Sequence, residues 1–134
     1  MNFDPVGVDK SGEMYMKYHI PLTTVEKIQL LQRWILVQSF TYYELNANIA
    51  SDFEYDDNAK QLAEFKKTHP DEFKRSKYYE YFHDYCQDDI HYTSGFDLLD
   101  RVKKKDKELH RRIWMDAVWA LELKERYGLG GMSI

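Results

Sequence analysis

Residues 41–57, TYYELNANIASDFEYDD, decide how this chain is expected to fold. Tyr42 and Tyr43 come just before residues 46–48, Asn-Ala-Asn, which favour a turn because asparagine tolerates left-handed backbone angles. Ser51 follows, and serine is a preferred residue immediately before a helix. This order predicts two helices joined by a turn, with side chains from both helices around a small polar pocket.

A long helix is predicted upstream of the turn, over about residues 23–46. Thr23 and Glu26 have the spacing of a capping box, in which each side chain binds a free backbone N–H at the helix start. Apolar residues then recur at helical spacing and define one stripe: Val25, Ile28, Leu31, Ile35, Tyr42 and Leu45. Polar residues are expected outside this stripe: Gln29, Gln32, Arg33 and Gln38.

A shorter helix is predicted downstream of the turn, over about residues 52–68. Ser51 and Glu54 repeat the capping-box spacing, and acids in the first turn suit the positive end of the helix dipole. Pro70 ends this helix because the residue before a proline is pushed out of helical geometry. One further helical turn is expected within residues 71–76.

The second half of the chain starts with an aromatic region. Residues 77–99 have no sustained hydrophobic period, so we expect a loop with short helical or extended pieces and a turn at Gly95. The helical period then returns and predicts a long helix at about residues 104–127, the main packing partner of the first helix. Gly128 is placed for a left-handed C-cap, which Leu129 would close.

These elements predict a mainly α-helical protein with two long helices, one shorter helix and an irregular aromatic loop region. The domain is expected over residues 21–128, between an extended N-terminal arm over residues 1–20 and a loose tail over residues 129–134. A chain of 134 residues, 43% hydrophobic and 16% aromatic, fits a single domain that buries roughly two-thirds of its unfolded surface.

Composition limits the classes of partner. A net charge of −4 disfavours general nucleic-acid binding, which depends on clustered lysine and arginine. The single cysteine, Cys86, cannot form an internal disulfide, and no stretch is apolar enough for a signal sequence or a membrane span. We therefore expect a cytoplasmic protein without membrane contact.

Residues 42–56, YYELNANIASDFEYD, followed by KTHPDEF at residues 67–73, resemble the small N-terminal helical domain of bacterial NAD-dependent DNA ligases. The approximate family pattern is YYxxDxPxISDxEYD, then a helix, then HPEL, and the spacing from Tyr42 to His69 is ungapped. In addition, SGFDL at residues 94–98 resembles small phage-encoded proteins that carry this ligase-like domain alone.

The resemblance implies a site for the nicotinamide mononucleotide (NMN) half of NAD, which this domain recognises in the ligases. The matching positions are Tyr42, Tyr43, Asp52, Tyr55 and Asp56. A tyrosine face attracts the cationic pyridinium ring, and carboxylates accept hydrogen bonds from ribose hydroxyls or the carboxamide. The same side chains also suit a purely structural role, the tyrosines in helix packing and the acids in a charged helix start.

Several positions depart from the ligase pattern. Asn46 and Asn48 replace the Asp and Pro of the turn, Tyr43 stands where many ligases have His, and Ala50 replaces Ile. No segment matches the K-x-D-G motif, whose lysine is adenylated in ligases, and the chain contains no counterpart of the nucleotidyltransferase, OB or DNA-binding domains. We therefore expect no ligase activity from this chain alone, and no catalytic residues.

Two further groups of side chains have simple interpretations. The first group contains His83, Cys86 and His91. Three aspartates lie near them: Asp84, Asp88 and Asp89. The spacing of this group matches no zinc pattern, so we expect solvated loop residues and no metal site. Basic residues cluster near the start of the last helix, where a solvated surface is expected: Lys103, Lys104, Lys105, Arg111 and Arg112.

Two functions of different classes follow. The favoured one is a non-catalytic phage accessory protein that binds a host protein, for example as an inhibitor of a host defence nuclease. Acidic side chains at the second helix and tyrosine, tryptophan and methionine side chains suit such an interface. The alternative is a module that binds NMN or NAD without ligase activity. Under the favoured function the protein acts in the host cytoplasm.

Overall fold

The computed structural model describes residues 6–8, 14–16, 21–88 and 90–127 of a mainly α-helical protein. Two three-residue strands precede the helices and pair in antiparallel orientation, with Val6 opposite Met16. They lie within the segment for which an extended arm is predicted. In chain order, the elements are β1 (Val6–Val8), β2 (Met14–Met16), α1 (Thr24–Tyr43), α2 (Asp52–Thr68), α3 (Pro70–Lys74), α4 (Tyr79–Phe82), α5 (Gly95–Lys105) and α6 (Lys107–Tyr127).

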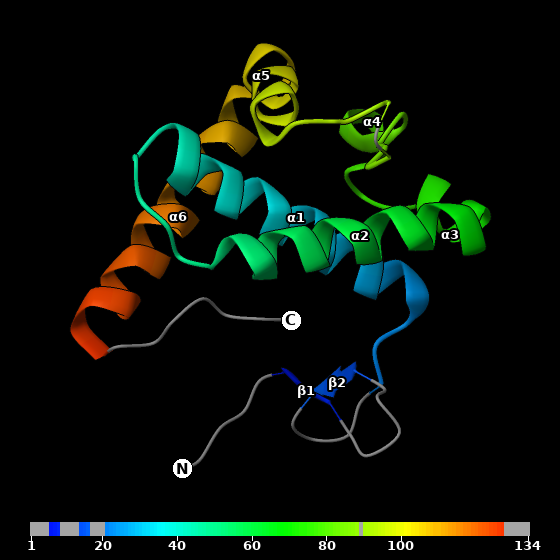
Figure 1. Cartoon of the computed structure of the whole chain (residues 1–134), viewed down its shortest axis with the longest axis horizontal. Coiled ribbons are helices and arrows are strands. Elements are labelled where there is room, and N and C mark those ends of the chain that lie inside the picture. Colours follow the sequence, from blue (N-terminus) through cyan, green and yellow to red (C-terminus); the bar gives the residue numbers. More distant parts are fainter. Residues whose placement is uncertain (1–5, 9–13, 17–20, 89, 128–134) are drawn as a thin grey trace.

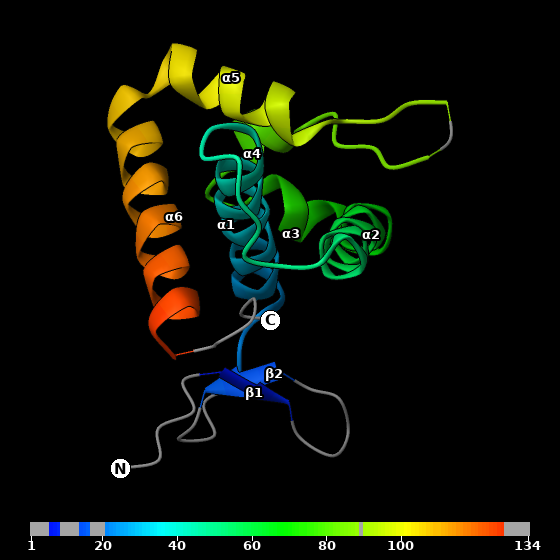
Figure 2. The ribbon, with the colours of Figure 1, turned by 60° about the vertical axis from the view of Figure 1, so that its left-hand side comes forward.

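Helix α1 is the centre of the helical part (Figure 1). It contacts α2, α3, α5 and α6. Figure 2 shows α6 on one side of α1, α2 and α3 on the other, and α5 across one end. The predicted packing of the last helix against the first is confirmed, and α1 is in addition covered from several other directions.

This central position overturns the prediction of a single buried stripe on α1. Every residue from 35 to 41 is buried, and Gln32 and Gln38 are only 0% and 4% exposed although both were expected outside the stripe. Gln32 is partly accommodated: its Nε2 donates a hydrogen bond to Ser76 Oγ at 2.9 Å, whereas its Oε1 has no partner among the described residues. A polar residue on α1 is therefore not a reliable sign of a solvent-exposed position. Because α1 has neighbours on several sides, it buries polar residues as well as apolar ones.

The predicted helix starts of α1 and α2 are found. Thr23 and Glu26 form the reciprocal capping box, with N–H to side-chain distances of 2.9 and 3.2 Å. Ser51 Oγ accepts the Glu54 N–H at 3.1 Å. Glu54 Oε2, however, has no hydrogen-bond partner in the described part of the chain, so only the serine half of that cap is seen.

The region after α4 is more regular than predicted. Instead of a loop up to residue 99 and one long helix, the chain forms α5 and α6 with a break at Asp106. Ser94 Oγ accepts the Asp97 N–H at 3.1 Å, and Asp106 Oδ1 accepts the Leu109 N–H at 3.0 Å. Each new helix therefore has its own side-chain cap, which makes two helices a stable alternative to one. The predicted C-cap at residues 128 and 129 lies outside the described residues.

The core gathers around α1. Its members include Ile28, Leu31, Ile35 and Leu36 of α1, Leu62 of α2, Phe73 of α3, Phe82 of α4, Leu98 of α5 and Ile113 of α6. Arg33 also joins α1 to α6, because its Nη2 lies 2.7 Å from Asp116 Oδ2. None of the described helices combines the length and the apolar composition that a membrane span requires.

Candidate functional site

A cavity of about 300 Å³ lies beside the second half of α1, where the turn leads into α2. All five residues predicted from the ligase resemblance line it: Tyr42, Tyr43, Asp52, Tyr55 and Asp56. The remaining lining residues are Gln38, Ser39, Thr41, Asn48, Ile49, Ala50, Ser51 and Tyr92. The two helices and the turn between them therefore surround a pocket, as the sequence predicts.

The turn between α1 and α2 sets the position of one wall. Asn46 has a φ of 50°, which is the left-handed conformation predicted for this segment. The Ala47 N–H then donates to Thr41 O at 2.9 Å, and Ile49 is buried with 2% exposure. Lys124 of α6 donates from Nζ to Asn48 O. The turn is thus held by its own backbone, by a buried side chain and by α6.

Two tyrosine rings from the end of α1 border the cavity. Tyr42 and Tyr43 are 55% and 45% exposed, and their centroids are 4.8 Å apart in an edge-to-face arrangement. Phe96 of α5 contacts Tyr43 at 5.8 Å between ring centroids. These rings are too exposed to be the core residues that a purely structural role would require. They leave aromatic surface available to a ligand.

Tyr55 enters the cavity from α2, across from α1. Its hydroxyl lies 3.3 Å from Ser39 Oγ, and Ser39 itself donates to Ile35 O at 2.7 Å. Because that proton of Ser39 is already engaged, Tyr55 is the donor in the pair. Burial raises the pKa of Tyr55 to about 12, with smaller upward contributions from Tyr92 and other neighbours, so the phenol remains neutral at physiological pH.

The charge on the cavity wall is negative. Asp52 and Asp56, in the first two turns of α2, are exposed lining residues, and no lysine or arginine occurs among the described residues of the lining. Carboxylates beside aromatic rings favour a cationic or hydroxyl-rich ligand and disfavour an anionic one. Among its described residues the lining has no histidine or cysteine either, so its polar groups are phenol and other hydroxyls, carboxylates and the side-chain amides of Gln38 and Asn48.

Gln38 is a lining residue that the sequence reasoning placed elsewhere. Neither its Nε2 nor its Oε1 has a hydrogen-bond partner among the described residues, although both atoms are buried. A buried amide without partners costs about 1–3 kcal/mol for each unsatisfied group. One signal was available in the sequence, because Gln38 precedes Tyr42 by four residues and so lies on the same side of the helix.

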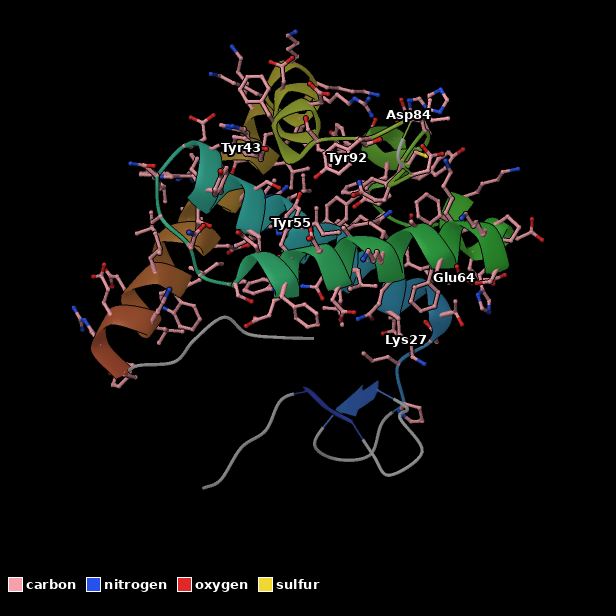
Figure 3. The ribbon with its side chains drawn as sticks, in the orientation of Figure 1. Lys27, Tyr43, Tyr55, Glu64, Asp84 and Tyr92 are labelled. Carbon is pink, nitrogen blue, oxygen red and sulfur yellow. The ribbon has the colours of Figure 1, made fainter. Side chains whose placement is uncertain are left out.

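Tyr92 is another lining residue that the sequence analysis did not assign to the site. It lies in the segment between α4 and α5, and Figure 3 shows Tyr43, Tyr55 and Tyr92 coming from three different segments. This segment is ordered by hydrogen bonds: Thr93 N–H donates to Cys86 O at 2.8 Å, and Cys86 N–H donates to Thr93 Oγ1 at 3.1 Å. The aromatic region thus contributes a wall to the cavity, and burial raises the pKa of Tyr92.

Cys86 and Asp84, two of the side chains considered for a metal site, make hydrogen bonds and ion pairs within the protein. Cys86 Sγ donates to Asp88 Oδ2 at 3.2 Å, while Arg101 holds Asp84 through contacts of 2.7 and 3.1 Å. The arginine lowers the pKa of the Asp84 carboxyl. Within the described residues, no three His, Cys, Asp or Glu side chains are grouped to hold a metal ion. Asp89 lies outside the described residues.

The basic residues near the start of α6 are partly neutralised. Lys104 pairs with Asp100 at 2.8 Å, Lys105 pairs with Glu80, and Arg111 Nε lies 3.6 Å from Glu108. Such pairs reduce the charge that this surface offers to a phosphate backbone. Burial, followed by the nearby Lys103, lowers the pKa of His110, so this histidine adds little positive charge.

His69, which matches the HPEL segment of the ligases, is remote from the cavity. It follows the last residue of α2, so 13 residues separate it from Asp56, or roughly 20 Å at the helical rise of 1.5 Å per residue. Its Nδ1 lies 2.8 Å from Thr68 Oγ1.

No family model matches this chain, and the chain matches no curated protein and no solved structure.

Proposed function

We propose that the cavity binds the NMN moiety, as free NMN or as part of NAD, without turning it over. The observation that carries this proposal is the unpaired amide of Gln38 among the five residues of the ligase-like pattern. A primary carboxamide offers one N–H and one C=O to the matching groups of glutamine. Because both polar atoms of Gln38 are buried, its side chain would turn into the cavity on binding, and the new hydrogen bonds would remove the cost of leaving these atoms unsatisfied.

The nicotinamide and ribose of NMN suit the same lining, whereas the phosphate would have to face solvent, because the lining is acidic and has no lysine or arginine among its described residues. The pyridinium ring is cationic and planar, and it would lie against the rings of Tyr42 and Tyr43, with Asp52 and Asp56 nearby. A volume of about 300 Å³ is at the lower limit of typical small-ligand sites and suits half of a dinucleotide better than the whole. An isolated half-site is expected to bind weakly, with a Kd of the order of 1 mM.

Removing a partner of the pyridinium or of the carboxamide should weaken NMN binding. We expect Asp56→Ala and Gln38→Leu each to raise the Kd by about tenfold, because each removes an interaction worth about 1.4 kcal/mol. Isothermal titration or NMR chemical shifts of the cavity residues would measure the effect. Asp57→Ala is the matched control, since Asp57 is the adjacent exposed acid and does not line the cavity.

Three results would contradict this proposal. The first is the absence of shifts at several millimolar NMN in a protein whose circular dichroism shows folded helices. The second is an equal loss of affinity in Asp56→Ala and Asp57→Ala, which would indicate attraction by general negative charge instead of a site. Turnover of NAD by the purified chain would contradict the non-catalytic part of the proposal.

A second function, binding of a basic protein, is favoured by the outer surface at the start of α2. Phe53 is 80% exposed and does not line the cavity, while the acids at 52, 56 and 57 around it are also exposed. An exposed aromatic side chain within an acidic rim suits a partner with a basic surface. By the resemblance to phage-encoded proteins, this partner would be a host protein, and a nucleic-acid-binding defence nuclease has the required charge.

Substitution of Phe53 separates this function from nucleotide binding. We expect Phe53→Ala to abolish capture of a partner from host lysate at low salt while leaving the Kd for NMN unchanged, because the residue lies outside the cavity. Capture by the unmodified chain should decrease at moderate salt, since exposed charge pairs are screened. If Phe53→Ala and the unmodified chain recovered the same amount of partner at both salt concentrations, the surface around Phe53 would not be the binding site.

A further inference from the structure

The outward side of α6 carries a second group of exposed apolar side chains. Trp114, Met115 and Trp119 are 46%, 50% and 62% exposed, and together with Val118 and Glu122 they line a hollow of about 200 Å³. The buried side of the same helix is formed by other residues: Leu109, Ile113 and Ala117. Figure 2 places α6 at the edge of the helical part, with α1 on its inner side. Two exposed tryptophans on one helix face are typical of an interface.

The charges and apolar residues of this face would match those of a second copy of α6 that runs in the opposite direction. Arg111, Met115, Val118 and Glu122 follow one another at spacings of four, three and four residues, so they form one stripe along α6. If a second α6 lies antiparallel to the first, centred between residues 116 and 117, Met115 faces Val118 and Arg111 faces Glu122. The two ion pairs form symmetrically, once at each end of the apolar centre.

We propose that a second copy of this chain docks on this face, with the two α6 helices antiparallel about a twofold axis. In this arrangement Trp114 meets Trp114 of the second copy on one flank, and Trp119 meets Trp119 on the other. The four tryptophans supply the large apolar contact area, and the Arg111 and Glu122 pairs fix the register. This inference does not depend on the proposed ligand, because the cavity lies between α1 and α2.

Like charges at the ends of the contact oppose the pairing and limit its strength. In the same register Glu108 would face Glu125 of the second copy and Lys107 would face Arg126, and Arg111 is already 3.6 Å from Glu108 within its own chain. Both glutamates lie at the exposed ends of the contact, where their repulsion is screened by solvent and salt. The charge pattern therefore still favours the antiparallel register, because the oppositely charged pairs lie nearer its centre.

Charge reversal at the two ends of the stripe tests the proposal. Sedimentation of the full chain from about 1 µM to about 1 mM should show a concentration-dependent monomer–dimer equilibrium. We expect Arg111→Glu and Glu122→Arg to shift each protein to monomer, because each variant places like charges opposite one another twice. An equimolar mixture of the two variants should recover the dimer, since every 111–122 pair is then opposite in charge.

Arg112→Glu is the matched control, because it reverses the same charge on the adjacent exposed residue, which lies outside the stripe. It should dimerise as the unmodified chain does, and circular dichroism should show equal helix content in all variants. A monomeric unmodified chain over the whole concentration range would overturn the proposal. So would single variants that dimerise normally, or a mixture that remains monomeric.

Discussion

Between pH 10 and pH 12 the free energy of unfolding is expected to fall by several kcal/mol. Burial raises the pKa of Tyr55 to about 12, from an ordinary value of 10, and it raises the pKa of Tyr85 further. In this range the unfolded chain loses phenol protons that the folded chain keeps. Each buried phenol therefore makes its full contribution to stability below pH 10, and this contribution is lost as the pH rises through the pKa of the folded state. A tyrosine whose pKa is raised from 10 to about 12 contributes up to about 2.7 kcal/mol.

Denaturant unfolding at a series of alkaline pH values would measure this loss, with tyrosinate absorbance reporting ionisation. Tyr55→Phe should make the free energy of unfolding fall less steeply with pH, because the contribution of the Tyr55 phenol is then absent. Ile35→Val is a suitable control, because it lowers stability by about 0.5–1.5 kcal/mol without removing a titrating group, so its slope should be unchanged. A stability that stays constant up to pH 12 would show that these phenols ionise freely in the folded protein.

Gly95→Ala is expected to destabilise the protein by about 1–3 kcal/mol and to disturb the cavity. A Cβ at this position would lie 2.1 Å from Ser39 Oγ, 2.7 Å from Ser39 Cβ and 3.0 Å from the Tyr55 hydroxyl. These distances are far below van der Waals contact, so α5 would have to move away from α1. Because Ser39 accepts the hydrogen bond from Tyr55, the movement should also weaken NMN binding.

A double-mutant cycle with Ser39→Gly tests this explanation. Removing the Ser39 side chain eliminates both of the shortest contacts, so the cost of Gly95→Ala should be smaller in the Ser39→Gly background. Thermal and denaturant unfolding of the four proteins would give the coupling energy. Strictly additive effects would show that the cost of Gly95→Ala does not come from its contacts with Ser39.

Local signals made the region around the cavity predictable. The capping pairs Thr23–Glu26 and Ser51–Glu54 act within one helical turn, so they fix the starts of α1 and α2 without reference to the remainder of the chain. The left-handed Asn46 is equally local. Once the two helices and the turn are placed, the neighbourhood of the tyrosines and aspartates follows, and the five predicted positions do line one cavity.

Long-range packing decided what could not be predicted. Gln38 is polar and was expected at the surface, but α1 has neighbours on several sides and buries it. Tyr92 reaches the cavity only because the segment from Cys86 to Thr93 folds back on itself. Helix α5 was missed because its serine cap is followed by Asp97 instead of the Glu or Gln of a capping box, amid aromatic residues without a clear period.

The burial of α1 has a consequence for synthesis on the ribosome. Among the described helices α1 comes first in chain order, yet the helix that covers one of its sides ends with the last described residues of the chain. From Tyr43 to Leu121 the ribosome adds 78 residues, which takes roughly 4–16 s at about 5–20 residues per second. During that interval the side of α1 that α6 covers in the finished protein is without its native partner. The packing around α1 can therefore be completed only after α6 has left the ribosome, even where α2, α3 and α5 have already formed.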